Sequence, residues 1–163
     1  MDKYNEFLRI AKHLNSELDI IPVLYGSLGL SRIIQKDLNS KDTDILVPQK
    51  YLTTDWDKLI KILEETGYLL VNEEEHEFIY LDNKIGIAFE EDLYPFAKIN
   101  HEDLKIVSDH DTRFKILDLD QYKKIYETSK NDSYRSDKNN KKDFEKIKLI
   151  DMYLETLNKP EII

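Results

Sequence analysis

Apolar residues along the chain follow two different spacings, and these spacings predict its secondary structure. Over residues 3–16 they recur every three or four positions, as on one face of a helix. Over residues 20–25 and 44–47 they form short continuous runs, which favour buried strands. The helical spacing returns over 28–35, 55–66, 120–129 and 143–157, and further short apolar runs lie at 68–71, 78–81, 85–89, 104–107 and 113–116.

Polar segments separate these elements and predict the connections. Asp82-Asn83 is a two-residue hairpin connection between two apolar runs, and Asp109-His110-Asp111 predicts a second hairpin. Residues 36–41 and 130–140 are polar and predict loops. This order of elements predicts an α+β fold, that is, a mixed α/β sheet flanked by helices, with helices at the C-terminal end.

The length of the chain limits how this fold is divided. A chain of 163 residues is enough for one domain with a real core, whereas two halves would each be small. We therefore expect a single domain over residues 1–163. Its sheet core covers about 18–116, and a helical part follows over about 117–158.

Composition narrows the class of protein further. The formal net charge is −9 at pH 7, and an acidic chain repels nucleic-acid backbone, so nucleic acid is not an expected partner. The chain has no cysteine, which excludes disulfides and thiolate metal sites. No apolar run approaches the ~20 residues that span a bilayer, and residues 1–6 lack the features of a signal peptide. We expect a cytoplasmic protein without a membrane partner; its oligomeric state is not indicated.

Gly26-Ser27 stands where a predicted strand meets a predicted helix. The start of a helix presents free backbone N–H groups and the positive end of the helix dipole, which suits a phosphate. Gly26 permits a close approach of backbone to ligand, and the Ser27 hydroxyl adds a donor. The alternative is an ordinary strand-to-helix turn, in which Gly-Ser is common.

Asp42-Thr43-Asp44 opens the next predicted strand. Side chains at positions i and i+2 of a strand point to the same face, with Cα atoms about 7 Å apart. Two carboxylates so placed can converge on a divalent ion, and their hard oxygen ligands suit Mg²⁺. The alternative is a polar entry to the strand in which one aspartate caps a turn.

The two motifs together resemble the signature of the nucleotidyltransferase superfamily, related to DNA polymerase β. The resemblance rests on residues 24–27 (Leu-Tyr-Gly-Ser) and 42–45 (Asp-Thr-Asp-Ile). The fourteen residues between Ser27 and Asp42 are most similar to the branch of lincosamide and 2″-aminoglycoside nucleotidyltransferases. The resemblance implies a mixed sheet, one or two Mg²⁺ ions on Asp42 and Asp44, and a nucleoside triphosphate such as ATP as donor. It implies in-line attack of an acceptor hydroxyl on the α-phosphorus.

The C-terminal part resembles the same superfamily more loosely. There a helix that carries a lysine is followed by a loop with arginine, here Arg135, and by a Lys-Asp pair, here Lys142-Asp143. On this resemblance we expect Lys124 and Lys142 to meet the β- and γ-phosphates. The alternative is that both are surface lysines and that Asp143 complements the dipole of its own helix.

Active members of the superfamily usually carry a third acid on a central strand after the aspartate pair. The matching strand here, residues 84–89, offers Gly86 and Ala88, which cannot ligate a metal. Glu90 lies on the same face and is the best substitute as third catalytic acid, beside Asp42 and Asp44. The weaker candidates are Glu91, Asp92, Asp82 and, from a neighbouring strand, Glu77.

Three hypotheses follow. The first is a small Mg²⁺-dependent nucleotidyltransferase that acts on a hydroxyl of a small molecule or a protein. The second is a catalytically inactive protein of this fold that binds a ligand or partner, which the missing third acid favours. The third is a toxin–antitoxin or stress component that uses the same site on a protein or RNA, although the negative charge disfavours RNA.

Overall fold

A seven-stranded mixed sheet forms the centre of the computed structural model, which describes residues 1–131 and 137–158, and for 137–141 and 158 the backbone alone. The elements are α1 (Lys3–Leu18), β1 (Val23–Tyr25), α2 (Gly26–Ile34), β2 (Asp42–Val47), α3 (Trp56–Glu65), β3 (Leu69–Asn72), β4 (Glu77–Tyr80), β5 (Asn83–Phe89), α4 (Leu93–Ala97), β6 (Lys105–Asp109), β7 (Thr112–Ile116), α5 (Leu119–Lys130) and α6 (Asp137–Asn158). Short 3₁₀ turns lie at Gln49–Leu52, Glu90–Asp92 and His101–Asp103.

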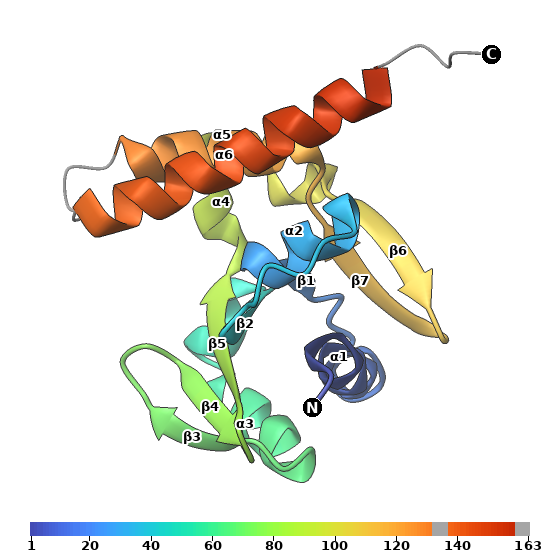
Figure 1. Ribbon diagram of the computed structural model, residues 1–163. Coiled ribbons are helices and arrows are strands. Elements are labelled where there is room, and N and C mark those ends of the chain that lie inside the picture. The colour runs from blue at the N-terminus through green and yellow to red at the C-terminus, as the bar shows by residue number, and fades with distance from the viewer. Residues whose placement is uncertain (132–136, 159–163) are drawn as a thin grey trace.

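The strands follow the order β3-β4-β5-β2-β1-β7-β6 across the sheet (Figure 1). β2 is antiparallel to β1 and parallel to β5. In this register Asp44 lies opposite Tyr25 on one side and opposite Gly86 on the other. The central strand β2 therefore carries its aspartates between the start of α2 and β5.

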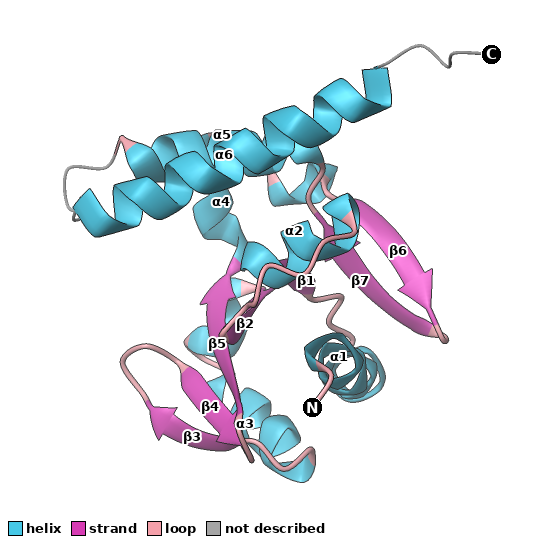
Figure 2. Cartoon of the chain, in the orientation of Figure 1, coloured by secondary structure: helices cyan, strands magenta, loops and turns pink. Residues whose placement is uncertain are grey.

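Alternate residues of the central strands pack into two separate cores. Ile45 and Ile85 join a buried cluster with α1 and α3, whereas Val23 and Leu46 join a cluster with α2, α4, α5 and α6. This division follows from the two-residue period of a strand, which sends neighbouring side chains to opposite faces. Figure 2 shows α5 and α6 packed together on one side of the sheet and α1 and α3 on the other.

The α+β prediction is confirmed, and the differences from the expected elements are local. β5 already begins at Asn83, which pairs with Tyr80 of β4 and is 1% exposed. The tight connection between the two strands is therefore Leu81-Asp82 rather than Asp82-Asn83. The sequence did not predict α4. α6 begins at Asp137, six residues before the expected Asp143. The expected start was too late because the first turns of this helix are polar and show no apolar period. Arg135 lies outside the described residues.

No helix within residues 1–131 and 137–158 is both long enough and apolar enough to cross a membrane.

Candidate functional site

The start of α2 is built directly against the carboxylate of Asp44. Gly26 has a φ of 66°, a conformation that favours glycine, and a Cβ at this position would collide with Asp44 Oδ2. Among the residues that the structure describes, no side chain caps this helix start by a hydrogen bond, which leaves its first backbone N–H groups for a ligand. The fold thus places the start of α2, which attracts anions, next to the carboxylate of Asp44.

Ser27 has a second role that its motif did not predict. Its hydroxyl lies 2.6 Å from that of Ser40, in the segment between α2 and β2. This hydrogen bond ties the loop before Asp42 to the first turn of α2. The backbone N–H of Ser27 remains at the helix start, so the phosphate-binding prediction for Gly26 and Ser27 rests on the backbone.

Asp42 and Asp44 share one face of β2, as predicted, but their environments differ. The side chain of Asp42 is 43% exposed, whereas Asp44 lies deeper in the cleft. Burial, together with the nearby charges of Asp42 and Glu77, raises the pKa of Asp44 to about 6. A partly buried carboxylate near two others is costly when ionised, and a bound cation would reduce that cost.

One lysine already lies among these acids. Lys84 Nζ on β5 is 2.8 Å from Glu77 Oε2 and 3.8 Å from Asp42 Oδ2. Glu77 lies opposite Gly86 in the register of β4 and β5, and therefore on the same row as Asp44. Of the acids considered as substitutes, Glu77 is the one whose charge acts on Asp44.

The structure does not bring Glu90 to the aspartate pair. Gly86 is level with Asp44, and four further residues of extended chain correspond to about 13 Å. The carboxylate of Glu90 is instead buried with Lys115, whose Nζ lies 3.1 Å from Oε2. Its other oxygen lies 3.4 Å from His101 Nδ1. Counting positions along β5 could not reveal these partners, because both come from later in the chain.

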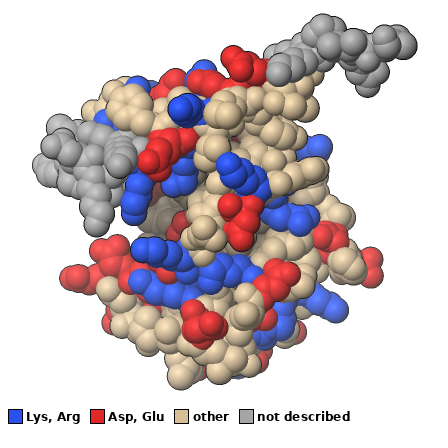
Figure 3. Space-filling model, viewed as in Figure 1, with Lys and Arg blue, Asp and Glu red and all other residues tan. Residues whose placement is uncertain are grey.

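A cleft of about 250 Å³ opens beside Gly26, Ser27 and Asp44. Its other wall consists of α5 and α6, which contribute Tyr122, Tyr126, Lys142 and Lys146 among others. Figure 3 shows a hollow below α6 with Lys and Arg side chains on both of its sides. The cleft therefore joins acids on the sheet to lysines on the C-terminal helices.

The two predicted phosphate lysines are separated by the fold. Lys142 lines the cleft, whereas the Nζ of Lys124 donates to the Lys98 carbonyl oxygen at 3.3 Å, away from the aspartates. Lys146, one helical turn after Lys142, lines the cleft although the sequence did not single it out. The sequence did contain one signal for Lys146: it follows Lys142 by four residues, and residues with this spacing lie on the same face of a helix.

Asp143 does not complement the start of its helix, because α6 begins six residues earlier. Its carboxylate is 5% exposed and accepts a hydrogen bond of 2.8 Å from the hydroxyl of Ser129 on α5. This buried bond links the two helices that form the basic wall of the cleft.

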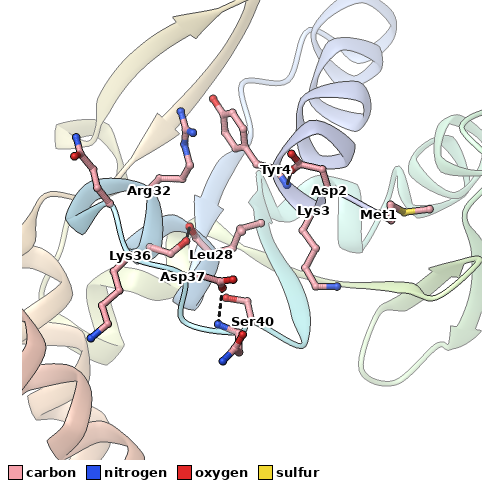
Figure 4. A pocket seen from close by; sticks show the side chains of 12 residues that line it. Met1, Asp2, Lys3, Tyr4, Leu28, Arg32, Lys36, Asp37 and Ser40 are labelled. Atoms are coloured by element: carbon pink, nitrogen blue, oxygen red, sulfur yellow. Dashed lines mark hydrogen bonds between the residues drawn. The ribbon is translucent and has the colours of Figure 1, made fainter.

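A second and larger cleft, of about 700 Å³, lies between the first turn of α1 and the end of α2 (Figure 4). Several of its polar side chains are engaged within the protein. Asp2 caps α1 through the backbone N–H groups of Tyr4 and Asn5, and the Arg32 guanidinium stacks 3.6 Å from the centre of the Tyr4 ring. Figure 4 shows Lys3 and Lys36 on opposite sides of this cleft. None of the predicted site residues lines it.

The two aspartates can supply only part of the ligands of a metal ion, and water and a substrate would supply the others. Within the described parts of the chain, no group of three or more His, Asp or Glu side chains is arranged to hold a metal ion. Mg²⁺ commonly binds proteins through one or two carboxylates and completes its shell with water and substrate phosphates. Asp42 and Asp44, next to a phosphate-attracting helix start, fit that mode of binding.

Comparison with solved structures defines the class of fold. The crystal structure of ANT(2″)-Ia in complex with adenylyl-2″-tobramycin superposes with a TM-score of 0.57 at 11% sequence identity, covering 94% of this chain and 90% of that one. The solution structure of the antibiotic-resistance factor ANT(2″)-Ia gives 0.54 at 12% identity, covering 94% and 86%. The chain has a nucleotidyltransferase-like fold, which confirms the resemblance drawn from its motifs.

Sequence comparison identifies the family more narrowly. The chain belongs to the family of YnaI, an uncharacterized protein of Bacillus subtilis (strain 168). The two are 46% identical over 150 residues, which cover 92% of this chain and 96% of YnaI. No protein-family model matches the chain.

Proposed function

We propose that this protein is a Mg²⁺-dependent nucleotidyltransferase, which moves a nucleoside monophosphate group from a nucleoside triphosphate to a hydroxyl of a small molecule or a protein. The observation that carries the proposal is the contact between the uncapped start of α2, at Gly26, and the carboxylate of Asp44. The first attracts anions and the second attracts cations. A phosphate that brings Mg²⁺ with it satisfies both.

Each wall of the cleft has its own role in this proposal. The backbone N–H groups of Gly26 and Ser27 bind phosphate oxygens. Asp42 and Asp44 would hold the metal, which would supply charge neutralisation at the phosphates. Lys142 and Lys146 reach the outer phosphates from α6. The chain acts as a single domain in the cytoplasm, with the helical part at about 117–158 closing over the sheet core at about 18–116.

The transfer itself is a displacement at the α-phosphorus. The acceptor oxygen forms a bond to that phosphorus while the bond to the bridging oxygen of pyrophosphate breaks. Pyrophosphate leaves with the electron pair, and the proton of the acceptor hydroxyl passes to water or to a carboxylate of the cleft. The protein contributes position and charge compensation, as in other phosphoryl transfers.

The alternative is an inactive protein of this fold that binds a nucleotide or a partner. It is favoured by Gly86, which lies level with Asp44 on β5 without an acid, and by Glu90, which is engaged with Lys115. A third role, as a toxin–antitoxin or stress component that modifies a protein, would use the same site with a different acceptor.

Thermal unfolding with Mg²⁺ and each nucleoside triphosphate at millimolar concentration tests the site. We expect at least one triphosphate to raise Tm only when Mg²⁺ is present, because a ligand that binds the folded state stabilises it. The Asp42→Asn/Asp44→Asn variant should lose this rise, and Asp57→Asn, an exposed aspartate on α3, should keep it. No rise with any triphosphate, or a rise that survives in the double variant, rejects the proposed site.

Release of pyrophosphate then separates the enzyme from the binding protein. Wild type incubated with Mg²⁺, the triphosphate that raises Tm, and a panel of hydroxyl-bearing small molecules and proteins should release pyrophosphate faster than Asp42→Asn/Asp44→Asn. A clear rise in Tm without release above that variant supports the inactive binding protein.

A further inference from the structure

Tyr122 on α5 lines the cleft, and its hydroxyl lies against Gly29 in the first turn of α2. The residue is 1% exposed and lines the same cleft as Gly26 and Asp44. A Cβ on Gly29 would collide with this hydroxyl. Gly29 therefore provides the space into which the Tyr122 hydroxyl extends, and this explains the second glycine of the motif region.

This hydroxyl has no hydrogen-bond partner among the described residues. Two other buried tyrosines have paired hydroxyl groups. Tyr68 is fully buried, and its hydroxyl donates to Glu6 at 2.9 Å and accepts from Asn83 at 2.7 Å. Tyr51 donates to the carbonyl oxygen of Leu18 at 3.1 Å. Leaving a buried hydroxyl unpaired costs stability, so its retention at this position calls for an explanation.

We propose that Tyr122 is a ligand-binding residue whose hydroxyl donates a hydrogen bond to an oxygen of the phosphate held at the N-terminus of α2. The identity of the ligand in this inference rests on the proposed function. The position of the Tyr122 side chain in the cleft does not depend on that function. The ligand must present an acceptor atom there, and phosphate oxygens are acceptors that the adjacent helix start attracts.

The surroundings of Tyr122 keep it a donor. Burial, together with the nearby Tyr126, Tyr25 and Asp44, raises the pKa of Tyr122 well above its ordinary value, so the phenol remains protonated at neutral pH. Its ring stacks on Tyr126, with ring centres 6.1 Å apart and an interplanar angle of 16°. The ring is thus fixed in position before any ligand arrives.

The proposal also gives the C-terminal helices a role in binding. Tyr122 belongs to α5, Lys142 and Lys146 belong to α6, and the Ser129–Asp143 bond joins the two helices. A phosphate held by these groups and by α2 would connect the helical wall to the sheet. Ligand binding should therefore stabilise the contact of α5 with α2.

The test is Tyr122→Phe, with Tyr68→Phe as matched control. Tm is measured without ligand, with Mg²⁺ and sodium pyrophosphate, and with Mg²⁺ and the nucleoside triphosphates. Without ligand, Tyr122→Phe should be as stable as wild type or more stable, since the change removes an unpaired buried hydroxyl. Tyr68→Phe should be less stable, since it leaves the side-chain amide of Asn83 without its acceptor and removes one of the donors to Glu6. With ligand, Tyr122→Phe should bind about tenfold more weakly than wild type, whereas Tyr68→Phe should keep wild-type affinity.

Each other outcome has a defined meaning. If Tyr122→Phe is destabilised without ligand as much as Tyr68→Phe, the hydroxyl has a partner within the protein and the proposal is wrong. It is also wrong if ligand affinity is unchanged. If wild type responds to pyrophosphate but to no triphosphate, and Tyr122→Phe loses that response, the proposal on Tyr122 holds while nucleotidyl transfer fails. If wild type responds to neither probe, both are rejected.

Discussion

The two walls of the cleft differ in charge and in origin. The sheet wall carries Gly26, Asp42 and Asp44, which lie within one β1–α2–β2 unit near the start of the chain. The helical wall carries Tyr122, Lys142 and Lys146, which come from the last two helices. The first wall combines a helix start with carboxylates, one of which pairs with Lys84, and the second wall carries two lysines. A ligand that contains both phosphate and Mg²⁺ complements the two walls at once.

The difference teaches how such a site can be assembled on an acidic chain. The net charge of −9 excludes broad attraction of phosphates, so the few cations must be concentrated where the ligand binds. Two lysines spaced one turn apart on α6 achieve this concentration. Their position depends on the packing of α6 against α5, to which a shared apolar cluster and the buried Ser129–Asp143 bond both contribute.

The largest expected effect comes from breaking the sheet wall at Gly26. Gly26→Ala places a methyl group against the Asp44 carboxylate and forces alanine to a positive φ. We expect a loss of about 2–3 kcal/mol in the free energy of unfolding, measured by urea denaturation, and loss of triphosphate binding.

Gly86→Ala is the matched control for this change. Its Cβ would lie 3.6 Å from Asp44 Oδ1, an ordinary contact, on the strand next to β2. We expect a loss below about 1 kcal/mol. Similar losses in both variants would contradict the specific role given to Gly26.

The second effect concerns the charge of Asp44. Its pKa in the metal-free folded protein is about 6, against 3.8 in the unfolded chain. The folded state therefore keeps a proton that the unfolded state has lost between about pH 4 and pH 6, and stability falls as pH rises through that window. In EDTA, Asp44→Asn should be more stable than wild type above pH 6, by an amount on the order of 1–2 kcal/mol after allowance for solvent screening.

That difference should shrink as pH falls from 6 to 4, and it should vanish only below the unfolded-state pKa of 3.8, where both states of wild type are protonated. Urea denaturation across pH 4–8 measures it. A difference that does not depend on pH would show that Asp44→Asn acts through packing rather than through charge. With Mg²⁺ and triphosphate above pH 6, wild type should gain stability and Asp44→Asn should not.

The third effect tests the helical wall. Lys142→Ala and Lys146→Ala should each weaken binding of the Mg²⁺–triphosphate complex about tenfold, since each removes one charge-assisted contact to a phosphate. The free energy of unfolding without ligand should change little, because Lys142 is exposed and Lys146 only partly buried. Isothermal titration calorimetry provides the affinities.

Lys124→Ala is the control on the helical wall, because Lys124 lies on α5 but donates to Lys98 outside the cleft. Its affinity for the complex should equal that of wild type. If Lys124→Ala lost as much affinity as Lys142→Ala, Lys124 would have to contact the ligand, and the arrangement of the cleft described above would be wrong.

The smallest expected effect on binding comes from Glu90. Glu90→Gln removes the charge that Lys115 pairs with and should cost about 3 kcal/mol of stability. Affinity for the complex should stay unchanged, because Glu90 lies beyond Ala88 and away from Asp44. A Glu90→Gln variant that folds normally and loses binding would place Glu90 in the site after all.

Strand β5 shows where inference from sequence reached its limit. Alternation along residues 84–89 correctly placed Gly86 and Ala88 on the face of the aspartates. It could not show that Glu77, from β4, lies level with Asp44, because the register between two strands cannot be derived from the residues of one strand alone. It also could not show that Glu90 turns toward Lys115 and His101.

The sequence by itself determined the α+β class, the order of the strands and of the longer helices, and the combination of a Gly-Ser helix start with an Asp-x-Asp strand. These features depend on periodicity and on motifs a few residues long, which local physical chemistry controls. Only the tertiary structure decided which lysines face the cleft, that Gly29 makes room for the Tyr122 hydroxyl, and that Glu90 pairs with Lys115 instead of joining Asp44. Those features depend on contacts between segments far apart in the chain, and the packing of α5 and α6 on the sheet sets them.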